Sequence, residues 1–235
     1  ELDLTFPAEN LGAGPETLAA MANHKAAKEL AKAAKGMIIV GQGALARSDG
    51  AAVLAAARTI AEDWGWVSDD WNGFNVLHTA AARVAGLDLG LLPGKGGRDV
   101  AGIKAAAASG DIEVVYLLGA DEIDRGDLGD AFVIYQGHHG EAGAQGADVI
   151  LPGAAYTEKD ATWVNTEGRV QLGRRAVFPP GEAREDWAVI RALSGVMGHA
   201  LPYDNLDALR VRMEKAAPHF ADVDEVPNAK WGAFG

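Results

Sequence analysis

Two glycines between a predicted strand and a predicted helix are the best candidates for contacting a nucleotide. Gly41, Gly43 and Ala46 fit the pattern G-x-G-x-x-[GA] directly after the strand expected at 37–40. In dinucleotide-binding folds such glycines let a pyrophosphate approach a helix N-terminus. The carboxylates at 62–63 precede the next apolar residues instead of ending a strand, so no partner for a ribose is in place. We therefore interpret the glycines as permitting a tight strand-to-helix turn, with nucleotide binding as the alternative.

Two adjacent imidazoles are the candidate metal ligands. His138 and His139 follow a predicted strand, lie between two glycines and precede Glu141. In α/β folds, ligands gather at this carboxyl edge of the sheet. Adjacent side chains diverge in extended backbone, however, and no spacing such as H-x-x-x-H supports the pair. We expect a polar, flexible loop and no metal here.

Charged side chains around a predicted hairpin could in principle transfer protons. They are Glu158, Asp160, Glu167 and Arg169. Paired carboxylates can act as general acid and base, but we expect a salt-bridged or solvated hairpin surface. No serine lies in a G-x-S-x-G context, and the glycine-rich loop 93–98 around Lys95 lacks the frame of a P-loop. The sequence therefore supplies no nucleophile and no phosphate loop.

The composition is that of a folded, acidic protein without cysteine. The chain has 235 residues, 49% of them hydrophobic, which is enough for an ordinary buried core. Its net charge of −12 would repel phosphate backbones, so we expect no nucleic-acid partner. The absence of cysteine excludes disulfides, thiol nucleophiles and cysteine-ligated iron–sulfur clusters from this chain.

No segment has the character of a membrane span or a leader. The longest strongly apolar run, 114–120, is far shorter than the ~20 residues that cross a bilayer. We therefore expect no direct membrane insertion. The chain opens at Glu1 without Met and without a basic-then-apolar leader, so we expect a piece of a longer protein and no signal peptide.

Alanine-rich helices alternate with short β-branched runs through the first two thirds of the chain. This order predicts an α/β fold, with helices on a mostly parallel, Rossmann-like sheet. We expect helices at 24–35, after a cap at Ser48 or Asp49, and between Asp99 and Gly110, and strands at 37–40, 114–118, 132–135 and 148–151. Val53, Leu54, Ala57, Ile60, Ala61 and Trp64 are expected on the buried face of the second helix, and Val100, Ile103 and Ala107 on that of the third. Residues 66–92 show no clear period and are interpreted as a loop and then a helix around 78–85.

The pattern changes after Pro152. Residues 162–165 and 169–172 flank the three-residue loop 166–168, which predicts a β-hairpin. Helices are expected over 183–197 and after Pro202, the second one capped by Asp204 with Asp207. The chain should therefore divide into an entry segment and helix (1–35), an α/β sheet domain (36–152), a hairpin with a helical C-terminal part packed on it (153–217) and an irregular tail (218–235).

The most specific motif of the chain runs from Ala147 to Gln171. It combines A-D-V-x-L-P, E-K and N-x-E-G-R-V-Q, whose positions include Asp148, Pro152, Glu158, Lys159, Thr162, Asn165, Glu167, Gly168 and Arg169. Together these elements resemble the molybdopterin oxidoreductase superfamily. The stretches 37–44, 71–78, 118–122, 135–140 and 184–187 make the chain more closely similar to the G subunits of NADH-quinone oxidoreductase, respiratory complex I. This resemblance extends from about Gly36 to Pro218 and is to the C-terminal part of those subunits.

The resemblance implies a molybdopterin-enzyme fold that has lost its pterin. It implies no cofactor in this segment, with iron–sulfur clusters in the N-terminal part of the parent subunit. The motif residues would then be structural, and Gly41, Gly43, Gly119, His138 and His139 would be vestiges of a cofactor site. The implied partners are the cluster-bearing part of the same subunit and other hydrophilic subunits of complex I. The implied location is peripheral, on the cytoplasmic side of the bacterial inner membrane or the matrix side in mitochondria.

Three hypotheses about function follow from these observations. The leading one is a structural, cofactor-less domain of a complex that transfers electrons from NADH to quinone. The second is an α/β fragment that still binds a nucleotide or pterin at 41–46 and at the loop of His138. The third is a free-standing small-molecule binding module.

Overall fold

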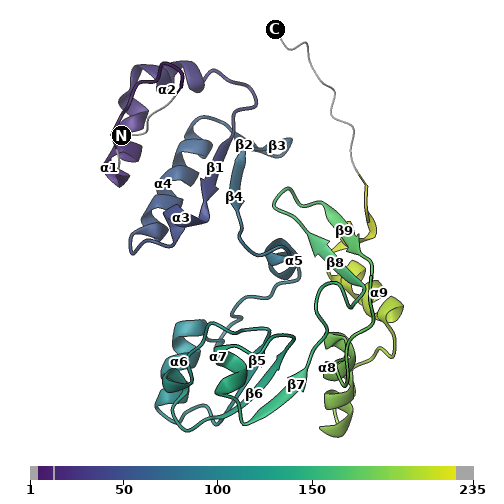
Figure 1. Cartoon of the computed structure of the whole chain (residues 1–235). Helices are drawn as coiled ribbons and strands as arrows, with labels where there is room; N and C mark the ends of the chain where they lie inside the picture. The colour runs from purple at the N-terminus through teal and green to yellow at the C-terminus, as the bar shows by residue number, and fades with distance from the viewer. Residues whose placement is uncertain (1–4, 13, 226–235) are drawn as a thin grey trace. The chain divides into compact units, whose positions relative to one another are not determined.

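The chain divides into two compact units, Glu1–Arg83 and Val84–Gly235. The computed structural model describes residues 5–12 and 14–225 (Figure 1). This division falls inside the segment 36–152, and the four-part organisation expected from the sequence stays a prediction.

The first unit is built on two parallel strands. Its elements are α1 (Pro15–Ala20), η1 (Met21–Asn23), α2 (Lys25–Leu30), β1 (Ile38–Gly41), α3 (Gln42–Leu45), α4 (Gly50–Asp63), β2 (Val67–Ser68), β3 (Trp71–Asn72) and β4 (Phe74–Leu77). β1 and β4 pair in parallel, with Ile38 opposite Phe74. The predicted face of α4 is confirmed, because Ala57, Ile60 and Ala61 are buried.

The prediction of a loop followed by a helix over 66–92 is wrong for its first half. β2 and β3 form a short antiparallel pair, and β4 is a strand of the main sheet. The helix that follows, α5 (Arg83–Asp88), begins later than expected. The strand was missed because Asn75 interrupts the apolar run of β4 and because aromatic residues precede it in the sequence without a clear period. Those aromatics are anchors: the Nε1 of Trp71 donates to the carbonyl of Gly36 at 2.9 Å.

Helix ends in the first unit also differ from the sequence prediction. α1 and η1 lie in the entry segment, where no helix was expected. α2 ends at Leu30 instead of Lys35. The amides of Lys32 and Ala33 donate to carbonyls three residues earlier, those of Glu29 and Leu30, instead of four residues earlier as in an α-helix. Asp49 occupies the N-cap position of α4 but makes no capping hydrogen bond, because its carboxylate pairs with the Nε of Arg47 at 2.7 Å.

The second unit contains a three-stranded parallel sheet and a separate hairpin. Its elements after α5 are α6 (Val100–Ala108), β5 (Val114–Leu118), η2 (Arg125–Leu128), β6 (Phe132–Gly137), α7 (Ala142–Gln145), β7 (Val149–Pro152), β8 (Ala161–Val164), β9 (Val170–Gly173), α8 (Asp186–Val196), α9 (Leu206–Ala216) and η3 (Pro218–Ala221). The sheet order is β5-β6-β7, and both pairs are parallel. The expected strands are confirmed, and the short elements η2 and α7 connect them.

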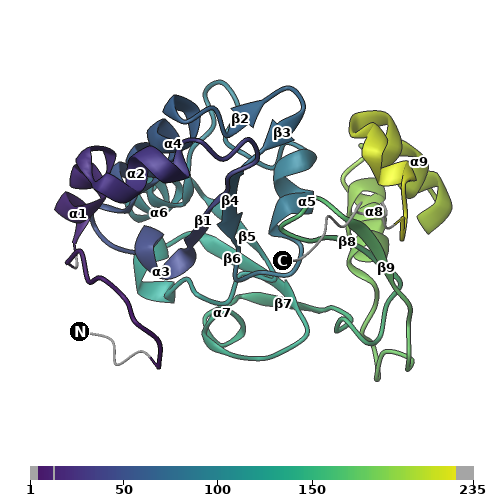
Figure 2. The same ribbon diagram turned by 90° about the horizontal axis from the view of Figure 1, so that it is seen from above.

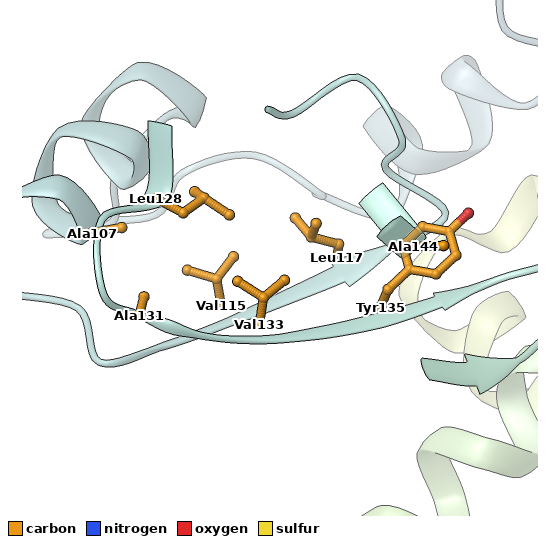
Figure 3. Close-up of a cluster of buried hydrophobic side chains, with 8 residues drawn as sticks. All are labelled: Ala107, Val115, Leu117, Leu128, Ala131, Val133, Tyr135 and Ala144. Carbon is orange, nitrogen blue, oxygen red and sulfur yellow. The ribbon is translucent and has the colours of Figure 1, made fainter. Parts of the chain in front are cut away.

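One face of this sheet carries the main core. Val115, Leu117, Val133 and Tyr135 alternate along β5 and β6 and point to the same side, where they meet Leu128 of η2 (Figure 3). Ala107 of α6 belongs to this core, and Asp99 caps α6 through the amide of Gly102 as expected. Val100 was placed on the buried face but is 60% exposed, because it begins the helix, seven residues before the buried Ala107.

The C-terminal helices lie beside one another, as Figure 2 shows. The Nη2 of Arg191 on α8 pairs with Asp204 at 2.7 Å. That pairing removes Asp204 from its predicted capping role, which Asn205 takes by accepting from the amide of Ala208 at 2.8 Å. α8 begins at Asp186 instead of 183 and ends at Val196, so Met197 is exposed. The tail is irregular from 222 to 225 but begins with η3, which buries Phe220; residues 226–235 lie outside the described part.

Within the described ranges, no helix has the length and hydropathy that crossing a bilayer requires.

Candidate functional site

The fingerprint glycines lie at the carboxyl end of β1, where α3 begins at once with Gln42. The tight strand-to-helix turn is confirmed, but it does not need glycine: Gly41 has φ −79° and ψ 148°, and Gly43 is helical. A Cβ on either glycine would meet no atom within 4 Å. The side chain of Gln42 contacts Nδ1 of His78, just beyond β4, at 3.2 Å. The glycines therefore leave open space at this edge of the first unit, without a conformational reason of their own.

The histidine pair lies at the carboxyl end of β6 in the second unit. The expectation that the two side chains diverge is wrong, because Nδ1 of His138 and Nδ1 of His139 face one another in direct contact. Both residues are exposed. The hydroxyl of Tyr135 donates to the carbonyl of His139 at 2.9 Å and fixes the loop backbone. Burial, and then the charges of nearby carboxylates, raise the pKa of Tyr135 above its ordinary value, so this hydroxyl remains a donor.

Gly119 lies at the neighbouring strand end and takes φ +60°, in the left-handed region. The loop after it supplies Asp121, whose Oδ1 accepts from the amide of Gly143 at 2.7 Å. In the described ranges, no three His, Asp or Glu side chains come together in a way that could hold a metal ion. The absence of a resident metal nevertheless stays a prediction.

A buried polar network joins the same sheet edge to α8. Gln136 is fully buried on β6, and its Oε1 accepts from the hydroxyl of Tyr116. Its Nε2 donates to Oδ1 of Asp186 at 2.9 Å, and Oδ2 of Asp186 pairs with Nζ of Lys159 at 2.5 Å. Burial and the charge of Asp186 raise the pKa of Tyr116. The four side chains therefore connect β5, β6, the motif segment and the first turn of α8.

Sequence reasoning missed this network, although one signal for it was available. Gln136 is the polar residue of an otherwise apolar strand, and a polar side chain at a core position needs a buried partner. Lys159 was singled out only by its family motif, and Asp186 only by its place in the stretch 184–187.

The motif residues are spread along the second unit and mostly bind backbone. Oδ2 of Asp148 accepts from the amide of Val133 at 2.7 Å, and Oε2 of Glu158 accepts from the amide of Ala155 at 2.9 Å. Pro152 ends β7, and its carbonyl accepts from the amide of Arg184 at 3.1 Å. These bonds hold turns and strand ends in place.

The predicted hairpin is confirmed, but its strands are Ala161–Val164 and Val170–Gly173, so the five residues 165–169 lie between them instead of three. Thr162 pairs with Leu172 and Val164 with Val170, and the Asn165 amide donates to the carbonyl of Arg169 at 3.2 Å. Gly168 closes the turn at φ +81°, the arrangement of a hairpin with a glycine bulge.

Of the two alternatives expected for the charged residues of the hairpin, salt-bridged or solvated, the described part of the chain does not show the ion pairs. None of the four charged side chains Glu158, Asp160, Glu167 and Arg169 joins an ion pair there. Glu167 is exposed, and Oδ1 of Asp160 accepts instead from the amide of Arg175 at 3.1 Å. Nε of Arg169 is buried and finds no hydrogen-bond partner among residues 5–12 and 14–225.

Asn165 organises the turn. Its Oδ1 accepts from the amides of Glu167 and Arg169, both at 3.0 Å. We expect Asn165→Leu to lower the free energy of unfolding of the 235-residue chain by about 2 kcal/mol, because two amides lose their acceptor. Gly168→Val should cost more, since a β-branched residue is strained at positive φ. Urea denaturation measures both, and Asn165→Asp is the control that keeps the acceptor. Wild-type stability in Asn165→Leu would show that the turn does not depend on this side chain.

The parallel sheet, its short crossovers and the polar loops at its strand ends define an α/β protein of the Rossmann-like class. A family model described as molybdopterin oxidoreductase matches residues 1–196, and the chain belongs to this family.

Curated relatives match nearly the whole chain. The NADH-ubiquinone oxidoreductase 75 kDa subunit of Reclinomonas americana is 43% identical over 230 residues, which cover 97% of this chain and 33% of the relative. The mitochondrial NADH dehydrogenase [ubiquinone] iron-sulfur protein 1 of Solanum tuberosum is 45% identical over 95% of this chain and 29% of its own length. The G subunit of the NADH-quinone oxidoreductase of Rickettsia bellii is 40% identical over 98% of this chain and 32% of its own length. The chain spans about a third of each relative, and the resemblance indicated by its motifs is confirmed.

Proposed function

We propose that this chain acts as a structural, cofactor-less domain of the G subunit of complex I, within an enzyme that transfers electrons from NADH to quinone. The match to such subunits over 95–98% of the chain carries this proposal. The contacts of the site support it. The side chains of Asp148, Glu158 and Asn165 accept hydrogen bonds from backbone amides. In the buried network, Gln136 and Asp186 bond to each other.

The proposed partners are the cluster-bearing part of the parent subunit and other hydrophilic subunits of the complex. The proposed location is peripheral, on the cytoplasmic face of a bacterial inner membrane or the matrix face in mitochondria. Epitope-tagging the gene in its own organism tests both. The tagged protein should migrate on a native gel with the NADH dehydrogenase activity, and a free protein that never joins this band would contradict the assignment.

We expect the purified chain to carry no stoichiometric metal and no redox cofactor. Cysteine ligands are absent from the sequence, and the histidine pair has no third ligand among residues 5–12 and 14–225. Elemental analysis and the visible absorption spectrum of freshly purified protein measure this. Stoichiometric molybdenum, tungsten, zinc or iron would refute the expectation.

The alternative function is retained binding of a nucleotide or pterin at the fingerprint glycines. The open space over Gly41 and Gly43 favours it, and the missing acidic partner for a ribose opposes it. We expect calorimetric titration of NADH into the chain to give no heat of binding. Micromolar binding that Gly43→Val abolishes, and that the exposed control Gly94→Val retains, would establish the alternative.

A further inference from the structure

The strand β3 of the first unit ends in the dipeptide Asn72-Gly73, and no other asparagine of the sequence precedes a glycine. In an unfolded chain such a dipeptide loses ammonia spontaneously, because glycine has no side chain to restrict the approach of its nitrogen to the neighbouring amide. The nitrogen of Gly73 first gives up its proton to water. It then attacks Cγ of Asn72, and the side-chain nitrogen leaves as ammonia. Water opens the resulting cyclic imide to aspartate or isoaspartate, so one water is consumed for each ammonia released.

In the folded chain, both reacting groups are held in hydrogen bonds. The amide of Gly73 donates to the carbonyl of Trp66 at 2.7 Å, next to the antiparallel pair of Val67 and Asn72. Oδ1 of Asn72 accepts from the amide of Phe74 at 3.1 Å, which fixes the side chain. Asn72 is exposed to water, whereas Gly73 is buried. Because the attacking nitrogen must lose its proton, the bond between Gly73 and Trp66 has to open before the reaction begins.

The acceptor of this bond belongs to a residue that is itself anchored. Trp66 is 4% exposed, and its Nε1 donates to the carbonyl of Ala33 at 3.1 Å. Its backbone amide donates to the carbonyl of Ala61 at 2.8 Å, and its ring packs edge-on against Trp64 with 4.9 Å between the ring centres. Movement of the Trp66 carbonyl therefore requires a local unfolding of the first unit.

Only glycine fits at position 73, so the fold keeps the reactive dipeptide. A Cβ there would lie 2.2 Å from the carbonyl oxygen of Gly36 and 2.7 Å from that of Trp66. The carbonyl of Gly73 also accepts from the amide of Ile38, the first residue of β1, at 2.7 Å. Isoaspartate adds one carbon to the main chain directly before Gly73. The backbone bonds of Gly73 to Trp66 and Ile38 then no longer fit together, and the first unit does not close again as before.

We propose that Asn72 is a site of covalent modification whose reaction is controlled by opening of the first unit: the folded chain suppresses loss of ammonia, and an opened chain is converted to aspartate and isoaspartate. The site thereby turns a reversible opening into a permanent mark. This inference concerns the first unit alone and does not depend on the proposed scaffold function.

The test incubates the full 235-residue chain in mildly alkaline buffer, with and without a denaturing concentration of urea. Mass spectrometry of the peptide that contains residue 72 measures the conversion with time. We expect the wild type without urea to react at least about tenfold more slowly than in urea. Trp66→Ala should raise the rate without urea roughly tenfold, because it removes the anchor of the acceptor carbonyl. Leu91→Ala, which truncates a side chain that is 82% exposed in the second unit, is the control expected to react as the wild type does.

Three outcomes would overturn the proposal. Equal rates for the wild type with and without urea would show that the fold gives no protection. A wild-type rate in Trp66→Ala would show that the anchored carbonyl does not control the reaction. No conversion even in urea would show that the dipeptide is not reactive in this sequence.

Discussion

Asp186→Ala should lower the free energy of unfolding of the chain by about 3 kcal/mol. Asp186 is the branch point of the buried network, and its two oxygens separately satisfy Gln136 and Lys159. Removal of the carboxylate leaves Nε2 of the fully buried Gln136 with only a long, 3.4 Å bond to the carbonyl of residue 186, and leaves the mostly buried ammonium of Lys159 without its partner. Buried groups that lose their partners cost more than the net gain of their bonds.

Asp207→Ala is the matched control for this change. Both aspartates lie in the first turn of an eleven-residue helix, so both substitutions remove the same favourable interaction with the helix dipole. The side chain of Asp207 is 94% exposed, and its nearest cation is 3.9 Å away. We expect the control to cost less than about 1 kcal/mol. Equal midpoints for the two variants in urea would show that the network contributes nothing to stability.

Leu128→Ala should also destabilise the chain by about 3 kcal/mol, because it leaves a cavity in the core between η2 and the sheet. Leu128 is 1% exposed and lies against the buried faces of β5 and β6 (Figure 3). Leu91→Ala removes the same atoms from a side chain that is 82% exposed, and we expect no measurable change there. Thermal or urea unfolding compares the two, and a loss in Leu128→Ala no larger than in Leu91→Ala would contradict the assignment of this core.

The elements that the sequence predicted correctly are those with a clear local signal. The strands β5, β6 and β7 are largely apolar runs that end at glycine or proline, and α6 has its cap in Asp99. The hairpin was found because Gly168 supplies the positive φ that its turn requires.

The elements that were missed depend on contacts between residues distant in sequence. β4 is a strand because it pairs with β1, more than thirty positions earlier in the sequence. Asn75 interrupts the apolar residues of β4, so no local pattern indicates a strand there. Asn205 caps α9 in place of Asp204 because Arg191, on another helix, binds Asp204. Local propensity does not contain either contact.

The candidate site shows the same division. The positions of the fingerprint glycines and of the histidine pair at strand ends followed from the order of the elements. The meeting of Tyr116, Gln136, Lys159 and Asp186 did not, because these side chains come from four segments that only the folded chain brings together.

We propose that this chain supports an NADH:quinone oxidoreductase without taking part in its chemistry. The most direct test is the rate of electron transfer from NADH to quinone per assembled complex, measured with the variants His138→Ala, His139→Ala and Gly43→Val in the parent subunit. We predict that the rate per assembled complex equals that of the wild type in all three variants, whatever their effect on the yield of complex. A rate that falls in any of them while assembly is complete would contradict the scaffold function and would place a reacting or ligand-binding group in this domain.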